Sequence, residues 1–331
     1  MADNRTASHV KHIGVLTSGG DAPGMNAAIR AVVRTAYYHK LTISGIFEGF
    51  DGLINDEVKP LGVRDVSNII QRGGTILRSA RSKAFRTTEG RQAAKETMER
   101  HGMDALVVIG GDGSFKGASI FSSEHGIPTM GITGTIDNDL GGTDTTIGFD
   151  TATNTAMEMV DRIRDTASSH DRLFFVEVMG RTTGAIAVHC GIAAGAEFVM
   201  VPEKKQGINE LIGVLECAAK SKSSVIVIVA EGDEEGGAYE VARKVKERFK
   251  HYDTRVSVLG HVQRGGRPSV ADRLLASQSG VAAVEGLIQG RKNAMAGIVN
   301  GKIVLTPFEQ VIGLKKTVDD DLLRILSILA I

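Results

Sequence analysis

Two aspartates separated by one residue are the first feature of this sequence that could do chemistry. Asp137 and Asp139 lie in GTIDND (134–139), directly after an apolar run. Two carboxylates this close repel each other. Either a nearby cation offsets this repulsion, or the two charges serve a reaction. Aspartate ionises near ~3.9 in model peptides, so it can orient a hydroxyl and accept its proton late in a phosphoryl transfer. The alternative is an Asn-Asp turn with an ordinary capping role.

Two glycine-rich segments have the features of a phosphate site. TSGGDAPGMN (17–26) places Gly19 and Gly20 before an expected helix, whose free N–H groups favour a phosphate. GGDGS (110–114) places Asp112 between glycines, where a carboxylate can reach Mg²⁺ while nucleotide phosphates lie against the backbone. The first segment has neither GxGxxG nor GxxxxGK[ST] spacing. A tight turn without a ligand is the alternative at the first segment, and a structural aspartate at the second.

Basic residues gather where other strands are expected to end: Arg81, Arg172, Arg181, Arg255, His261 and Arg264. The chain carries 39 Lys+Arg and 39 Asp+Glu, so these cations do not reflect a generally basic protein. They indicate a polyanionic transition state and a second phosphate on the acceptor. A zinc site is not indicated, because the sequence has no HxxxH or Cys/His set.

The elements that must position these residues alternate between strand, glycine-rich loop and helix. Strands are expected over 12–17, 43–49 and 127–132, and strands that run into loops over 104–113, 172–181, 224–232 and 255–266. Helices are expected over 25–38, 66–74, 89–102, 150–167 and 317–328, with Gly102 ending the third and Ser114 capping a helix after 104–113. A hairpin is expected over 297–305, with Asn300-Gly301 at its turn. Continuous apolar strands predict a parallel sheet covered by helices.

The unusual polar clusters all fall near predicted strand ends: SGGD, RGG…SAR, GGDGS, GTIDND, MGR, AEG and GHVQR. In open parallel α/β sheets, ligands bind beyond the carboxyl ends of the strands. One such loop is weak evidence, whereas seven on one chain predict a binding site.

Length and composition bound the function classes. A chain of 331 residues suits two α/β domains, with boundaries near 148 and 263. The balanced charge gives no general attraction to nucleic acid or to an anionic membrane. No apolar stretch reaches the ~20 residues of a membrane span, and the polar start is no signal peptide, so we expect a cytoplasmic protein. Cys190 and Cys217 are expected to be buried, inert thiols.

From Ile13 to about Leu305, the motifs resemble those of the bacterial-type ATP-dependent 6-phosphofructokinases. The matching segments are GVLTSGGDAPGMNAAIR, RGGT, SAR, VVIGGDGS, GTIDND, DTASSHDR, EVMGR and LGHVQRGG, in family order. The resemblance implies the phosphofructokinase fold, with two Rossmann-like α/β domains. It implies an ATP-binding domain (1–148 plus 263–312) and a fructose-6-phosphate-binding domain (149–262 plus 313–331). It further implies a Mg²⁺-dependent glycolytic kinase that forms fructose 1,6-bisphosphate, as a homotetramer with active sites shared between subunits.

Site residues are carried over by motif. For ATP, the resemblance implies Gly20, Arg81, Ser82, Gly111, Asp112, Gly113 and Ser114, with Asp112 also serving Mg²⁺. It implies Asp137 as the base toward the 1-hydroxyl, Thr135 and Asp139 as positioning groups, and Arg181 as the group that stabilises the phosphoryl. For the sugar phosphate it implies Met179, Gly180, Glu231, His261 and Arg264, with Arg172 and Arg255 from the next subunit.

Some positions bear on the donor and on regulation. Pyrophosphate-dependent relatives carry Asp at the position of Gly113 and Lys at that of Gly134, so the glycines here favour ATP. Thr133 stands where the family usually has proline, and we expect a looser turn. The loop after MGR reads TTG rather than the usual aromatic-or-His form. An ADP or phosphoenolpyruvate effector site is implied at Arg30, Arg34, Arg164, Glu197, Lys220 and Lys222.

Two rival readings remain open to test. An NAD-dependent dehydrogenase would need GxGxxG and an acidic residue about twenty positions on, and the first strand–helix turn has neither in register. A sugar-phosphate binding protein would explain the basic clusters but not GGDGS and GTIDND together. ATP-dependent loss of fructose 6-phosphate distinguishes the kinase from both.

Overall fold

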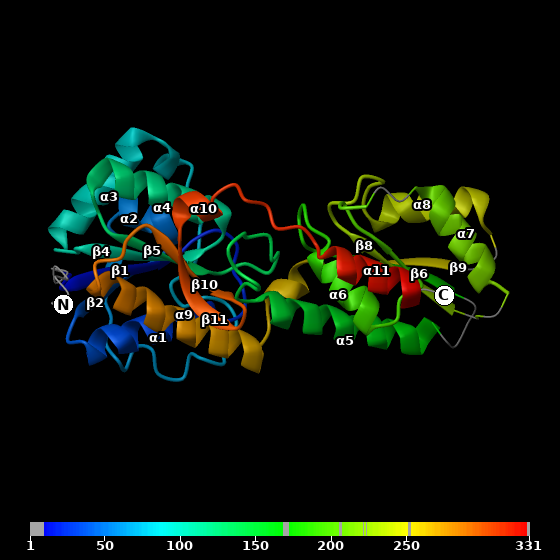
Figure 1. Ribbon diagram of the computed structural model, residues 1–331, viewed down its shortest axis with the longest axis horizontal. Helices are drawn as coiled ribbons and strands as arrows, with labels where there is room; N and C mark the ends of the chain where they lie inside the picture. Colours follow the sequence, from blue (N-terminus) through cyan, green and yellow to red (C-terminus); the bar gives the residue numbers. More distant parts are fainter. Residues whose placement is uncertain are drawn as a thin grey trace, which may run out of the picture. The chain divides into compact units, whose positions relative to one another are not determined.

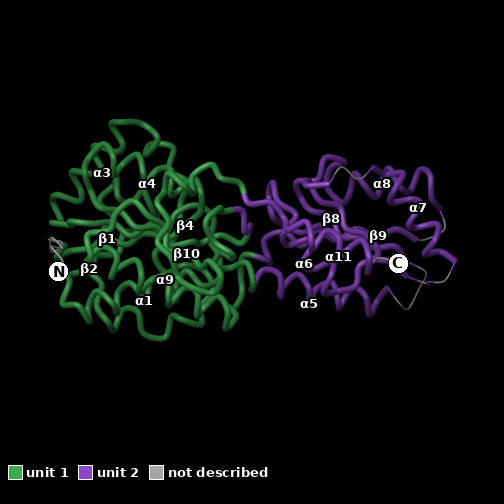
Figure 2. Tube along the Cα trace, viewed as in Figure 1, with its two compact units in different colours: residues 1–136, 140–150, 264–315 green, residues 137–139, 151–263, 316–331 purple. Residues whose placement is uncertain are grey.

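The computed structural model describes residues 10–167, 172–204, 207–220, 222, 224–250 and 253–329. The chain divides into two compact units, which Figure 2 colours separately. Unit 1 comprises residues 1–136, 140–150 and 264–315, and unit 2 comprises residues 137–139, 151–263 and 316–331. The acidic segment around Asp137 therefore belongs to unit 2, although both of its flanks belong to unit 1.

Unit 1 is built on a seven-stranded sheet in the order β11-β10-β5-β4-β1-β2-β3. The strands are β1 (His12–Thr17), β2 (Thr42–Ile46), β3 (Val58–Pro60), β4 (Ala105–Gly110), β5 (Thr129–Thr133), β10 (Ala294–Val299) and β11 (Lys302–Pro307). The central pairings are parallel, and only the outer pairs β2–β3 and β10–β11 are antiparallel. The apolar residues of β1, β4 and β5 are buried, as covering on both faces requires.

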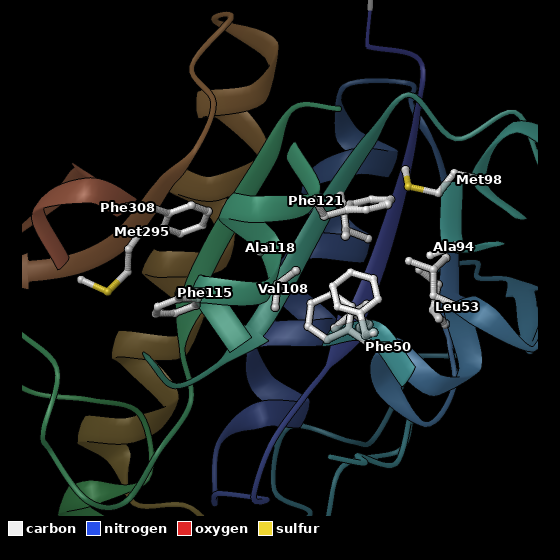
Figure 3. Close-up of a cluster of buried hydrophobic side chains, with 14 of the residues drawn as sticks. Phe50, Leu53, Ala94, Met98, Val108, Phe115, Ala118, Phe121, Met295 and Phe308 are labelled. Carbon is white, nitrogen blue, oxygen red and sulfur yellow. The ribbon is translucent and has the colours of Figure 1, made fainter. Parts of the chain in front are cut away.

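Helices cover both faces of this sheet. They are α1 (Met25–Tyr38), α2 (Gly49–Ile54), η1 (Ala84–Arg86), α3 (Thr88–Arg100), α4 (Asp112–His125), α9 (Val270–Ile288) and α10 (Phe308–Val311). Figure 1 shows α1 and α9 on one face, and α2, α3, α4 and α10 on the other. The core beneath the second group includes five buried phenylalanines, together with leucine, methionine, isoleucine, valine and alanine (Figure 3). Phe50 stacks on Phe85 with ring centroids 3.9 Å apart, and Phe115 stacks on Phe308 at 5.4 Å.

Unit 2 contains a four-stranded parallel sheet in the order β7-β8-β6-β9. Its strands are β6 (Arg172–Val178), β7 (Phe198–Met200), β8 (Ser224–Ala230) and β9 (Asp253–Val258). Its helices are α5 (Phe149–Ala167, which starts in unit 1), α6 (Ala185–Ala193), α7 (Ile208–Ala218), α8 (Ala238–Arg248), η2 (Gly260–Arg264) and α11 (Asp320–Leu329). The C-terminal helix packs on its own chain, because the Leu326 side chain is buried against α6.

The two α/β units with parallel-rich sheets confirm the predicted fold class. The helix expected over 25–38 is confirmed, and the hairpin turns at Asn300 and Gly301, whose φ values are 51° and 73°. The helix expected over 66–74 is wrong: this segment forms turns, and Asn68 has a left-handed φ of 56°, which a helix does not accommodate.

Two further expectations need correction. Ser114 does not cap α4, because the helix already begins at Asp112 and the preceding residue is Gly111. Cys190 is buried, and burial raises the pKa of its thiol to about 12, but Cys217 is exposed. Cys217 lies on the outer side of α7, away from the buried Leu211 and Leu215. None of the described helices is long and apolar enough to cross a bilayer.

Candidate active site

Six of the seven polar clusters follow a parallel strand. SGGD follows β1, GGDGS follows β4 and GTIDND follows β5 in unit 1, whereas MGR, AEG and GHVQR follow β6, β8 and β9 in unit 2. The seventh, RGG…SAR, follows no strand. It is held beside the start of α1 by Asn26, whose Nδ2 donates to the carbonyl groups of Arg72, Gly73 and Gly74.

The GGDGS loop leads into α4, and the space in front of the first residues of this helix is open. Asp112 is the first helical residue, and its Oδ1 accepts from the Gly313 N–H at 3.1 Å. A Cβ on Gly113 would have no heavy atom within 4 Å. The Ser114 hydroxyl is buried and donates to Ser18 Oγ at 3.0 Å, which joins this loop to the one after β1. A helix N-terminus with open backbone on its approach suits a phosphate.

The loop after β1 is in contact with Arg264. Arg264 Nη1 donates to the Asp21 carbonyl at 3.2 Å, and a Cβ on Gly20 would lie 2.7 Å from the same nitrogen. Glycine at position 20 therefore makes room for the guanidinium. Arg264, predicted to bind the sugar phosphate, is mostly buried and belongs to unit 1, whereas His261 is exposed and belongs to unit 2.

The SAR segment is anchored by a residue that the sequence did not single out. Arg81 is exposed, and Ser82 Oγ accepts from the Phe85 N–H at 3.0 Å at the start of η1. Arg91 is mostly buried and forms a bidentate pair with Glu124 of α4, which lowers the pKa of Glu124. Arg91 Nη1 also donates to the Phe85 carbonyl at 3.1 Å. The predicted nucleotide loop is thus fixed to the helix that carries Asp112.

Thr133 and Thr135 lead into the acidic segment. β5 pairs with β4 as far as Thr133, opposite Gly110, so the expected loosening is not seen in the backbone pairing. Thr135 is mostly buried, and its N–H donates to the Ile147 carbonyl at 3.1 Å. A Cβ on Gly134 would lie 3.0 Å from Met25 Cε, so glycine here also serves close packing.

Asp137 is buried and paired with an arginine. Its Oδ2 lies 3.1 Å from Arg181 Nε, and its side chain is 1% exposed against 47% for Arg181. Its carbonyl accepts from the Thr183 hydroxyl at 2.9 Å. The next residue, Asn138, has a left-handed φ of 51°, a conformation that asparagine tolerates better than most residues. The tight turn between the two aspartates is therefore tied to the loop after β6.

A second cation lies beside the acidic segment. Lys316 Nζ donates to Asn138 Oδ1 at 3.4 Å, and the Lys316 N–H donates to the Asp139 carbonyl at 3.3 Å. Arg181 supplies positive charge to Asp137, and the Lys316 ammonium lies beside Asn138, the residue between the two aspartates.

The MGR turn is held by Glu231. Its Oε1 accepts from the Arg181 N–H at 2.7 Å and from the Gly180 N–H at 3.3 Å. Arg181 has a left-handed φ of 53°, and a Cβ on Gly180 would lie 2.5 Å from the Thr183 carbonyl oxygen. Glu231 thus fixes the backbone from which Arg181 reaches Asp137.

The sequence also missed Gln263. It is fully buried, and its Oε1 accepts from the Met179 N–H at 3.3 Å, which joins η2 to the MGR loop. Of the basic residues predicted around the sugar, Arg255 is exposed and paired with Asp253, and Arg172 is half-buried at the start of β6. Residues 168–171 of the DTASSHDR motif lie outside the described residues.

The predicted effector residues form two groups. In unit 2, Glu197 Oε1 lies 3.3 Å from Lys222 Nζ and 3.9 Å from Arg164 Nη1, while Lys220 is exposed. In unit 1, Arg30 and Arg34 lie on α1, where burial and then the charge of Arg34 lower the pKa of Arg30. A bound anion would relieve that repulsion.

Comparisons with known proteins agree with this geometry. The phosphofructokinase family model matches residues 12–287. An "ATP-dependent 6-phosphofructokinase 2" of Bacteroides thetaiotaomicron is 53% identical over 97% of this chain and 99% of its own length. An "ATP-dependent 6-phosphofructokinase" of Cytophaga hutchinsonii is 54% identical over 96% and 97%. The structure of phosphofructokinase from Saccharomyces cerevisiae matches with a TM-score of 0.89 and 36% identity, over 97% of this chain and 50% of that one.

Proposed function

The chain belongs to the phosphofructokinase family, and we infer that it transfers the γ-phosphoryl group of ATP to the 1-hydroxyl of D-fructose 6-phosphate. The products are ADP and fructose 1,6-bisphosphate, and the reaction is the committed step of glycolysis. The observation that carries this conclusion is the buried Asp137 carboxylate 3.1 Å from Arg181, in a chain about half identical to ATP-dependent 6-phosphofructokinases over nearly its full length.

Asp137 is the base in this proposal. A carboxylate is too weak a base to remove an alcohol proton before attack, so Asp137 orients the 1-hydroxyl and accepts its proton as the O–P bond forms. A well-placed base is worth ~10²–10⁴ in rate. Arg181 holds this carboxylate in the resting enzyme and neutralises the transferring phosphoryl group. Thr135 and Asp139 position the reacting groups on either side of the base.

Unit 1 supplies the nucleotide site. Gly20, Arg81, Ser82 and the loop from Gly111 to Ser114 bind ATP in this proposal. The described residues contain no group of three or more His, Cys, Asp or Glu side chains that could hold a metal ion. A kinase metal held by Asp112 together with nucleotide phosphates fits that arrangement, and an oxygen ligand suits Mg²⁺. When bound, Mg²⁺ would neutralise charge on the phosphates, while the Gly313 N–H keeps the Asp112 carboxylate oriented.

The sugar phosphate is bound by residues from the second half of the sequence. Met179, Gly180 and Glu231 contact the sugar in this proposal, and His261 and Arg264 bind its 6-phosphate. Arg172 and Arg255 reach the phosphate of a neighbouring subunit in a homotetramer. The ATP-binding domain is then 1–148 plus 263–312, and the sugar-binding domain is 149–262 plus 313–331. The enzyme acts in the cytoplasm, where its substrates occur.

ATP rather than pyrophosphate is the donor. Nothing within 4 Å would meet a Cβ on Gly113, which leaves the start of α4 free for the α-phosphate of a nucleotide. An aspartate there would add a negative charge against that phosphate. The choice of donor is tested by comparing turnover with ATP and with pyrophosphate, and faster turnover with pyrophosphate would overturn it.

Regulation by ADP or phosphoenolpyruvate is part of the proposal. The basic pair Arg30 and Arg34 binds effector phosphates, together with Arg164, Glu197, Lys220 and Lys222. Ser224 stands at a position that is basic in the family, and Ser223, the other such position, lies outside the described residues.

The activity is tested with a coupled assay that follows ATP-dependent loss of fructose 6-phosphate. Wild-type enzyme should require ATP, a divalent metal and the sugar phosphate together. Binding of fructose 6-phosphate without turnover would instead support the sugar-phosphate binding protein.

A further inference from the structure

The loop between β6 and α6 carries an unusual sequence, Thr182-Thr183-Gly184, that the reaction scheme leaves without a role. Thr183 is 5% exposed, whereas Thr182 beside it is exposed. The Thr183 hydroxyl donates to the Asp137 carbonyl at 2.9 Å, in a bond between residues 46 positions apart. The one buried hydroxyl of this loop therefore forms its hydrogen bond with the backbone of the proposed base.

The same loop holds Asp137 at two points. Arg181 contacts the carboxylate, and Thr183 contacts the carbonyl. The carbonyl fixes the peptide plane between Asp137 and Asn138, and that plane sets the direction in which the Asp137 side chain leaves the backbone. Together the two contacts restrain both the backbone and the side chain of Asp137.

The loop itself is rigidly supported. The Thr183 N–H donates to the Gly180 carbonyl at 3.0 Å, which closes a turn around Arg181. The next N–H, that of Gly184, donates to both carboxylate oxygens of Glu203, at 2.9 and 3.0 Å. A Cβ on Gly184 would lie 2.5 Å from Val201 Cγ1, so only glycine allows the approach. Thr183 is therefore fixed on both sides, and its hydroxyl has a defined direction.

We propose that Thr183 is a positioning residue for phosphoryl transfer, whose hydroxyl holds the backbone of Asp137 so that the carboxylate faces the acceptor alcohol. This inference rests on the proposed role of Asp137 as the base. Thr183 is buried and its hydroxyl donates to the Asp137 backbone, so we expect it to act on the rate of the chemical step and not on substrate affinity. A misplacement of the base by about 1 Å can cost about 100-fold in rate.

The test compares substitutions at two neighbouring threonines. Thr183→Val and Thr183→Ala remove the donor, and Thr183→Ser keeps it. Thr182→Val makes the same chemical change at an exposed position and is the matched control. Thr183→Val and Thr183→Ala should lower kcat by about 10- to 100-fold with KM for both substrates within about 2-fold, whereas Thr183→Ser and Thr182→Val should stay within about 3-fold of wild type.

A second measurement separates misplacement from partial unfolding. Calorimetric titration with fructose 6-phosphate should give one site per chain and an unchanged Kd in every variant. If Thr183→Val does not fold, the comparison of Thr183→Ala with Thr183→Ser carries the same test.

Two results would overturn the inference: a donor-free variant with wild-type kcat, or Thr183→Ser as impaired as Thr183→Ala. Wild-type enzyme that lacks ATP-dependent turnover would reject the proposed function, whereas an active wild type with an equally active Thr183→Val rejects this inference alone.

Discussion

Asp137 Oδ2 and Arg181 Nε lie 3.1 Å apart, although the aspartate side chain is 1% exposed and the arginine side chain 47% exposed. Burial of a carboxylate is unfavourable unless it is paired. The exposed side of the guanidinium leaves it able to contact an incoming phosphoryl group while its Nε stays with Asp137. The pair therefore joins a buried carboxylate to an accessible cation, the combination that the proposed transfer to an alcohol requires.

Substitution of Arg181 should affect both rate and stability. Arg181→Gln should lower kcat by about 10²- to 10³-fold, because it removes a cation from the transferring phosphoryl group. It should also lower the urea midpoint of unfolding, because a buried carboxylate loses its ion pair. Arg162→Gln is the matched control, since Arg162 is 70% exposed on α5 and pairs only with Glu158 of its own helix. Equal effects of the two substitutions would contradict the role of Arg181.

The two glycines of the donor site should behave differently from each other. Gly113→Asp should fold normally, because a Cβ there meets no heavy atom within 4 Å, and should lose at least about 10-fold in kcat/KM for ATP. Gly134→Lys should instead lose roughly 1–3 kcal/mol of stability, because its Cβ would lie 3.0 Å from Met25 Cε and 3.1 Å from Ile109 Cγ2. Kinetics and thermal unfolding of each variant distinguish these effects. An active, wild-type-like Gly113→Asp enzyme would rule out its contact with ATP.

Substitution of Thr133 by valine should increase the stability of the protein. The buried Oγ1 of this threonine has no hydrogen-bond partner among the described residues, so Thr133→Val removes an unsatisfied hydroxyl at nearly constant volume. We expect a gain of about 1 kcal/mol, measured as a higher urea midpoint. Thr129 is the control on the same strand: its hydroxyl donates to the Ile127 carbonyl at 3.2 Å, so Thr129→Val should be destabilising. A lower midpoint for Thr133→Val would mean that its hydroxyl is satisfied.

Effector control should depend on the basic pair of α1. ADP or phosphoenolpyruvate should shift KM for fructose 6-phosphate in wild type, and Arg30→Gln combined with Arg34→Gln should abolish that shift while kcat stays within about 2-fold. The physical reason is that an anion between these two residues relieves their mutual repulsion. Steady-state titrations with each ligand check it. Wild-type kinetics insensitive to both ligands would remove the effector site.

The sequence correctly predicted those elements that depend on a local pattern of residues. Apolar spacing identified the helix over 25–38, and Asn300-Gly301 identified the hairpin turn, because both depend on neighbouring residues. The same reasoning failed at 66–74, where the left-handed Asn68 breaks an apparently helical pattern. It also failed for Cys217, which lies on the exposed side of α7, opposite the buried Leu211 and Leu215.

The contacts that support the site could not be predicted from the sequence, because they join residues far apart along the chain. Gln263 lies 84 positions from Met179, and Thr183 lies 46 positions from Asp137. No local signal links such pairs, although the TTG departure marked the loop in which Thr183 lies. In the sequence, Arg91 is one polar residue among many on a helix, and only its contacts with Glu124 and the Phe85 carbonyl distinguish it.

The most direct test of the account is the single-turnover rate of phosphoryl transfer by Asp137→Ser and the isosteric Asp137→Asn, measured with saturating ATP and fructose 6-phosphate. Both should be slower than wild type by about 10²- to 10⁴-fold, with fructose 6-phosphate binding largely retained. Wild-type rates in either variant would contradict the assignment of Asp137 as the group that receives the proton.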